Sequence, residues 1–102
     1  MAKADAALSR AIAGAKQAKT LAEACGGLGA LWDQLTTLNQ VMPPAGSEQA
    51  FSEERNGIFM LLDVMRDQRC DESSGADADM IRDELGQLRK EFVALQQEGA
   101  AQ

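Results

Sequence analysis

The sequence contains no histidine and no tyrosine, and it has only two cysteines. Without histidine, the usual general base and the imidazole metal ligand are both missing. Two cysteines alone cannot supply the roughly four soft ligands of a zinc site within one chain. They are also too few for a disulfide-rich secreted scaffold. We therefore expect no enzymatic activity and no cofactor.

Positive charge is also scarce. Lys and Arg number 10 against 16 Asp and Glu, which gives a formal net charge of −6 at pH 7. Nucleic acids and anionic membranes bind clustered positive charge, so neither is expected as a partner. No apolar run approaches the roughly 20 residues of a membrane span, and Asp5 and Arg10 interrupt the apolar core that an export signal would need. The expected location is the cytoplasm.

The cysteines of a cytoplasmic protein are expected to remain separate thiols. Cys25 lies beside a row of apolar residues, where a cysteine usually acts as a small buried hydrophobe. Cys70 lies near a polar helix end, where we expect it to be exposed and to react faster with a thiol reagent.

Apolar residues make up 45% of the chain and recur at helical spacing. Pro43-Pro44 and the polar run 71–76 break the chain into three helical stretches, and no lasting apolar/polar alternation indicates a strand. We predict an all-α fold, a small bundle of three to four helices in one domain over residues 1–102, and we expect oligomerisation to complete its core. The helices are expected near residues 4–25, 28–41, 48–70 and 77–97.

The first stretch has two halves that differ in register. From Leu21 to Met42, apolar residues step by three and four, while the half before Leu21 is rich in alanine, which buries little area. We expect that first half to be frayed, bent or dependent on a partner. Gly26, Gly27 and Gly29 lie at the join, and they indicate either a close helix crossing or hinge, or a plain helix break.

The second stretch is apolar around most of its circumference between Ile58 and Met65. Such a helix is buried on more than one side, and we expect two neighbours within the chain to be too few to cover it. A second subunit, and hence a homodimer, follows as a prediction. The candidate interface residues on this stretch are Ile58, Leu62 and Met65.

The third stretch carries an apolar row flanked by acidic residues on one side and basic residues on the other. In a parallel pair of copies, Asp77 would meet Arg82 and Glu84 would meet Arg89 across the seam. The competing interpretation is that this helix packs on its own chain and leaves those charges in solvent. The candidate interface residues here are Ile81, Leu85, Leu88, Phe92, Leu95, Arg82, Glu84 and Arg89.

Two further patterns allow a ligand. Asp63, Asp67 and Asp71 repeat every four residues, as a divalent cation site or as a solvated face. The methionine and aromatic residues could line a groove for a partner helix or an apolar ligand, or simply fill the core.

The run Leu21-Ala22-Glu23-Ala24-Cys25, followed by Leu28, Leu31 and Leu35, and the later Gly57-Ile58 with Leu61-Leu62, resembles short all-helical proteobacterial proteins of unknown function. The resemblance covers about half of the chain and rests on Leu, Ala and Gly spacing. It implies a bacterial, helical protein able to form oligomers, and it brings no activity with it.

From these patterns we predict a non-enzymatic interaction or regulatory protein that acts through helix–helix contacts with itself or with a partner protein. The alternative is a helical-bundle binding protein for an apolar small ligand or a divalent cation. The sequence does not identify the partner or the ligand.

Overall fold

The computed structural model describes residues 2–43 and 45–100, and their side chains as far as Gln97. The prediction of an all-α fold is confirmed, and no strand occurs within these residues. The elements are α1 (Ala2–Gln17), α2 (Leu21–Ala24), α3 (Leu28–Leu35) with the 3₁₀ turn η1 (Thr36–Gln40), α4 (Glu48–Val64) with the π turn η2 (Met65–Arg69), the 3₁₀ turn η3 (Glu72–Ser74), and α5 (Ala78–Ala100).

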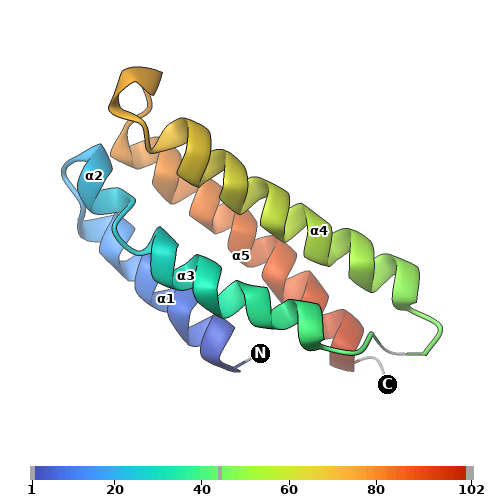
Figure 1. Ribbon diagram of the computed structural model, residues 1–102. Coiled ribbons are helices and arrows are strands. Elements are labelled where there is room, and N and C mark those ends of the chain that lie inside the picture. Colours follow the sequence, from blue (N-terminus) through green and yellow to red (C-terminus); the bar gives the residue numbers. More distant parts are fainter. Residues whose placement is uncertain (1, 44, 101–102) are drawn as a thin grey trace.

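The four long helical stretches run alternately up and down along an elongated bundle (Figure 1). Its principal extents are 43 × 21 × 19 Å. Helix α5 contacts both α4 and α1, and α1 also contacts α3. The short helix α2 turns the chain at one end of the bundle, and the loop after η1 turns it at the other (Figure 1).

The core is made within one chain, and it contains all eight apolar residues that the sequence offered as an interface. They are at most 1% exposed. The expectation that two neighbours could not cover α4 overlooked the folding of the first stretch into two antiparallel helices, α1 and α3. The bundle therefore has one more helix than the interface argument allowed, and these side chains offer no free surface to a second copy. They are Ile58, Leu62, Met65, Ile81, Leu85, Leu88, Phe92 and Leu95.

Helix α1 is a continuous helix of 16 residues, so the expectation of a frayed or bent first half is wrong. Its buried face consists of one leucine and four alanines, Ala4, Ala7, Leu8, Ala11 and Ala15. Small side chains let the neighbouring helices come close, and this closeness compensates for the little area that each alanine buries.

The register change in the first stretch marks a turn of the chain at residues 18–20. The Thr20 hydroxyl accepts a hydrogen bond from Glu23 N (3.2 Å), and the Glu23 carboxylate accepts one from Lys19 N (3.0 Å). This reciprocal arrangement closely resembles a capping box and starts α2. The single helix expected near residues 4–25 is therefore two helices.

The glycines unite both interpretations given above. Gly26 and Gly27 lie in the turn between α2 and α3, which is a helix break. A Cβ placed on Gly27 would lie 3.1 Å from Ala11 Cα, so the same turn is also a close crossing with α1.

The other two predicted breaks are confirmed. In the break that begins at Pro43-Pro44, Gly46 has a φ of +89°, and Pro44 lies outside the described residues. In the second, Gly75 has a φ of +79°, and Asp77 Oδ1 accepts a hydrogen bond from Met80 N (2.9 Å) that caps the start of α5. Hydrogen bonds from the backbone N–H and the hydroxyl of Ser73 lower the pKa of Asp71 in the same turn.

Cys25 and Cys70 are joined in a disulfide, so the prediction of two separate thiols with different reactivity does not describe this structure. The glycine turn presents Cys25 and the π turn presents Cys70, and their Cα atoms are 6.1 Å apart, within the range that a disulfide spans. The bond ties the α1–α3 half of the chain to the α4–α5 half at one end of the bundle.

Candidate functional site

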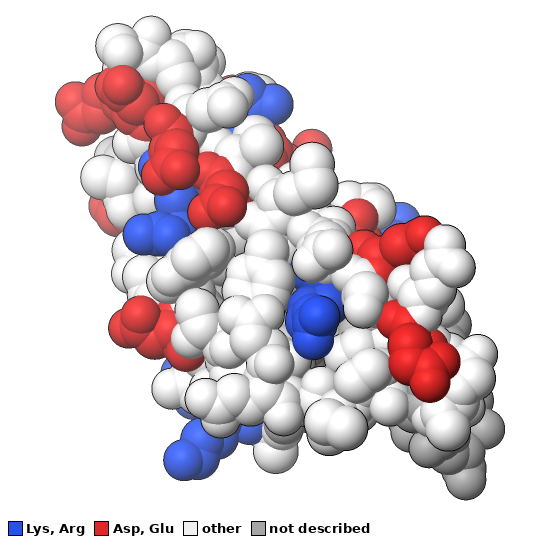
Figure 2. All heavy atoms as spheres, turned by 45° about the vertical axis from the view of Figure 1, so that its right-hand side comes forward, with Lys and Arg blue, Asp and Glu red and all other residues white. Residues whose placement is uncertain are grey.

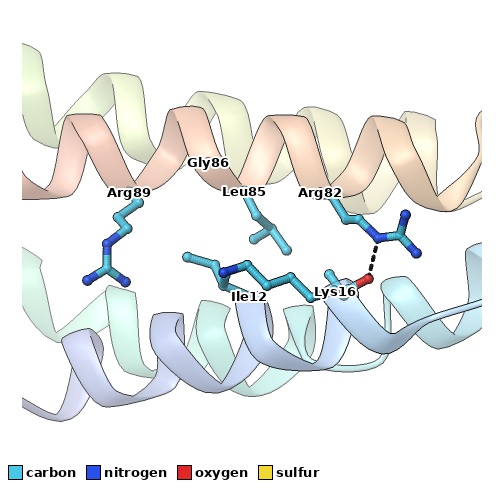
Figure 3. A pocket seen from close by; sticks show the side chains of 7 residues that line it. Ile12, Lys16, Arg82, Leu85, Gly86 and Arg89 are labelled. Carbon is cyan, nitrogen blue, oxygen red and sulfur yellow. Dashed lines mark hydrogen bonds between the residues drawn. The ribbon is translucent and has the colours of Figure 1, made fainter.

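A groove with a volume of about 220 Å³ lies between α1 and α5. Figure 3 shows that its side chains come from these two antiparallel helices and meet over the space between them. The lining residues are Ile12, Ala15, Lys16, Arg82, Leu85, Gly86 and Arg89.

The floor of the groove is apolar, and two of its residues, Ala15 and Gly86, have a small side chain or none. Ala15 and Leu85 are buried and Ile12 is half-buried. Gly86 is exposed, and a Cβ built on it would meet nothing within 4 Å. The helices are thus held at a fixed spacing by the core, while too few side-chain atoms are present to fill the seam above it.

Arg82 closes one end of the groove, and each of its three guanidinium nitrogens makes a hydrogen bond. Its Nε donates a hydrogen bond to the carbonyl oxygen of Ala15 (2.6 Å), and the rest of its guanidinium bonds the carbonyl oxygen of Ala18 and the carboxylate of Asp79. The Ala15 carbonyl oxygen also accepts a hydrogen bond from Ala18 N (3.2 Å), so Arg82 adds a second bond at the C-terminal end of α1, where carbonyl groups lack partners within the helix. Arg82 therefore acts as a structural clamp between α5 and α1.

Lys16 and Arg89 provide the remaining positive charge on the rim. Both are exposed, and within the described residues neither takes part in an ion pair. In Figure 3 the Lys16 side chain runs along the groove past Ile12, with its ammonium group toward the Arg89 side. Two cations without an acidic partner thus border one end of an apolar floor.

A second, more open hollow of about 350 Å³ continues past Arg82. It contains the carboxylates of Asp77 and Asp79 beside Lys19. The two hollows of the α1/α5 seam therefore differ in charge: the first is lined by cations and no carboxylate, and in the second two cations stand beside two carboxylates.

In the structure, the charged residues predicted to pair between two copies lie at the seams between helices of a single chain. Glu84 accepts a hydrogen bond from Arg69 Nε (2.9 Å), while Arg82 and Arg89 lie on the α1 side of α5. Glu84 and Arg89 thus serve different seams of the bundle. The interpretation in which this helix packs on its own chain describes the structure, although Glu84 and Arg82 are bonded rather than left in solvent.

The methionine and aromatic residues do not gather into a groove. Phe51, Met65 and Phe92 are core residues. Trp32 packs edge-on against Phe59, with ring centroids 5.6 Å apart, and the Arg66 guanidinium lies 4.7 Å from the Trp32 ring centroid. These contacts fill the seam between α3 and α4.

The acidic row does not form a candidate cation site. Within the part of the chain that the structure describes, no three His, Cys, Asp or Glu side chains are grouped so as to hold a metal ion.

Charge is unevenly distributed on the surface. Figure 2 shows one face on which acidic side chains lie toward the margins and a broad uncharged area surrounds an isolated basic side chain. No helix in the described residues is long and apolar enough to cross a membrane.

Comparisons with protein-family models, curated proteins and solved structures find no match to this chain. The resemblance to proteobacterial helical proteins therefore stays a prediction.

Proposed function

We propose that this protein is a non-enzymatic binding protein whose working surface is the groove between α1 and α5. Its ligand carries negative charge next to an apolar portion. The observation that supports this proposal is the pair of exposed cations, Lys16 and Arg89, beside an apolar floor in a chain of net charge −6.

The ligand complements the groove in both charge and polarity. An acidic protein repels anions at long range, so a local pair of unpartnered cations favours an anion only at that place. The floor adds the gain from removing apolar surface from water. Neither feature alone defines a ligand, but together they select a molecule that has both characters.

The test uses 8-anilinonaphthalene-1-sulfonate, an anionic aromatic dye, as the probe. We expect saturable binding to the native protein that weakens as salt is added. Gly86→Leu places a side chain in the groove and should lower the affinity at least tenfold. Gly14→Leu is the matched control, because Gly14 is also an exposed helical glycine with open space around it but does not line the groove.

Two outcomes would contradict the proposal: no saturable dye binding by the native protein, or an equal loss of binding in both glycine variants. The near-ultraviolet circular dichroism of Trp32 is recorded for every variant, so that dye binding to a loosened core is recognised.

Self-association is a second candidate, because Met60 projects from α4 with 69% of its surface exposed and Trp32 and Phe59 lie half-buried at the α3/α4 seam. We propose a homodimer through this face in place of the buried residues of α5. Sedimentation equilibrium at tens of micromolar tests it, and a monomer there removes the dimer.

The cytoplasmic location also stays a proposal, and the cysteine pair provides its test. Disulfides are rare in cytosolic proteins, so a cytoplasmic chain should carry Cys25 and Cys70 as thiols. Alkylation of intact cells before lysis, followed by mass spectrometry, should then find both residues labelled. Recovery of the unlabelled, bridged peptide pair would show an oxidising location instead.

A further inference from the structure

We propose that the ligand of the α1/α5 groove is a single-chain aliphatic carboxylate. Its carboxylate lies between the Lys16 ammonium and the Arg89 guanidinium, and its chain lies on the floor formed by Ile12, Leu85 and Gly86. This inference rests on the proposed function and specifies its ligand.

The position of the negative group follows from the charges along the seam. Arg82 is engaged by Ala15, Ala18 and Asp79 and has little left to offer a ligand. Beyond Arg82, two carboxylates, Asp77 and Asp79, stand against two cations, Lys19 and Arg82, so the charges of that hollow balance. Lys16 and Arg89 line the groove without an ion-pair partner in the described chain, and no carboxylate belongs to its lining.

The donors at that end favour a carboxylate over a phosphate. A guanidinium offers a planar fork that matches the two oxygens of a carboxylate, and an ammonium adds a point charge. A phosphate also needs donors for its remaining oxygens, which proteins often supply from backbone N–H groups at helix N-termini or in nests. The groove is lined from the interiors of α1 and α5, where backbone N–H groups are used within the helix.

The size of the groove favours a single chain. Its volume of about 220 Å³ is below the roughly 300–1,000 Å³ of pockets for drug-sized ligands. A two-chain lipid would exceed it, whereas one aliphatic chain can lie along the seam between the helices. Gly86 keeps this path open because it places no side chain there.

The experiment measures the affinities of octanoate, octanol and octylammonium for the protein by calorimetry and by the methyl NMR shifts of Ile12 and Leu85. Wild type should bind octanoate most tightly. Between hexanoate and octanoate, each added methylene should raise the affinity about fourfold, the fold-change that corresponds to about 0.8 kcal/mol per buried CH₂.

The groove variant is Lys16→Gln/Arg89→Gln, and the matched control is Arg10→Gln/Lys90→Gln. The control loses the same two charges from exposed positions that do not line the groove. We expect octanoate affinity to fall at least tenfold in the groove variant and less than twofold in the control. Octanol affinity should be the same in both. Thermal melts verify that each variant is folded.

Equal binding of octylammonium and octanoate, or equal losses in the two double variants, would overturn the carboxylate site. The carboxylate site is also overturned if octanoate fails to bind while the dye still binds and Gly86→Leu weakens that dye binding. In that case the proposed function stands. If neither the dye nor octanoate binds, both proposals fail.

Discussion

The two sides of α5 are built differently. Toward α4, large side chains such as Ile58, Leu62 and Met65 fill the core, and the Arg69–Glu84 ion pair borders it. Toward α1, the partner helix presents mainly alanines, and the seam above them is hollow. Both seams hold the bundle together, and the groove lies on the α1 side. A helix with an alanine face can pack closely without filling its edges, and a binding groove can form there at no cost to the core.

The largest expected effect tests the filled side. Leu62→Ala removes a fully buried side chain and should lower the free energy of unfolding by about 2–5 kcal/mol in urea denaturation. Met42→Ala changes a side chain that is 85% exposed, and as the control it should change the free energy of unfolding by less than about 0.5 kcal/mol. A loss in Met42→Ala as large as that in Leu62→Ala would contradict the difference in burial between the two side chains.

The second prediction concerns the bond that ties the two halves together. The disulfide closes a loop over a sequence separation of 45, and chain entropy places its contribution at about 4 kcal/mol at most. Reduction should therefore lower the stability by about 2–4 kcal/mol. Cys25→Ser/Cys70→Ser should show the same loss and no response to reductant.

Hydrogen exchange after reduction would locate that effect. Because α1 buries mainly alanines, its amides should lose more protection than those of α4 and α5. Uniform loss along the chain would show that the two sides of α5 open as one unit, which contradicts the comparison drawn above.

A smaller effect is expected where α1 meets the glycine turn. In Gly27→Ala the new methyl group would lie 3.1–3.2 Å from Ala11, and the resulting overpacking should cost about 1–3 kcal/mol in thermal unfolding. Gly29→Ala is the control, because nothing lies within 4 Å of its Cβ and alanine has the better helix propensity. A stabilised Gly27→Ala variant would show that α1 can move away freely.

The smallest expected effect tests whether the groove is empty at Gly86. Gly86→Ala should raise stability by up to about 1 kcal/mol, since alanine favours a helix over glycine and the added methyl group meets no atom. Differential scanning calorimetry should record a similar gain for Gly14→Ala. Destabilisation by Gly86→Ala alone would mean that the seam is more tightly closed than the structure shows.

Much of the fold follows from local sequence. Asp77 and the glycines at positions 46 and 75 mark turns that the structure contains, and the apolar spacing identifies the buried face of each long helix. The turn at residues 18–20 has a signal as well, because Thr20 and Glu23 have the spacing of a capping box. That signal was not recognised because the apolar row from Leu21 to Met42 begins directly after Thr20.

The neighbours of each face could not be predicted in the same way. Ile81, Leu85 and Leu88 have the same spacing whether they meet a second copy or their own chain, since periodicity defines a face and not what covers it. The Cys25–Cys70 pairing also depends on tertiary structure, because the two residues are far apart in sequence. For the groove, the available signal was Gly86, a helix-weakening residue between Arg82 and Arg89.

The π turn at the end of α4 has a consequence for chain length. Ile58, Leu62 and Met65 reach the core by steps of four and three, and the same steps would next bring Gln68 or Arg69 inward. The wider turn, with Cys70 N bonded to the Met65 carbonyl oxygen (2.9 Å), delays the inward position to the cysteine and leaves Arg69 free to meet Glu84. Deleting one residue from 66–68 would restore an α-turn with the cysteine still facing Cys25, whereas deleting one upstream of Met65 would rotate the core residues before it out of phase. The Cys25–Cys70 disulfide can therefore form with one residue fewer between Met65 and Cys70, and the π turn has the geometry of a helix that accommodates one extra residue.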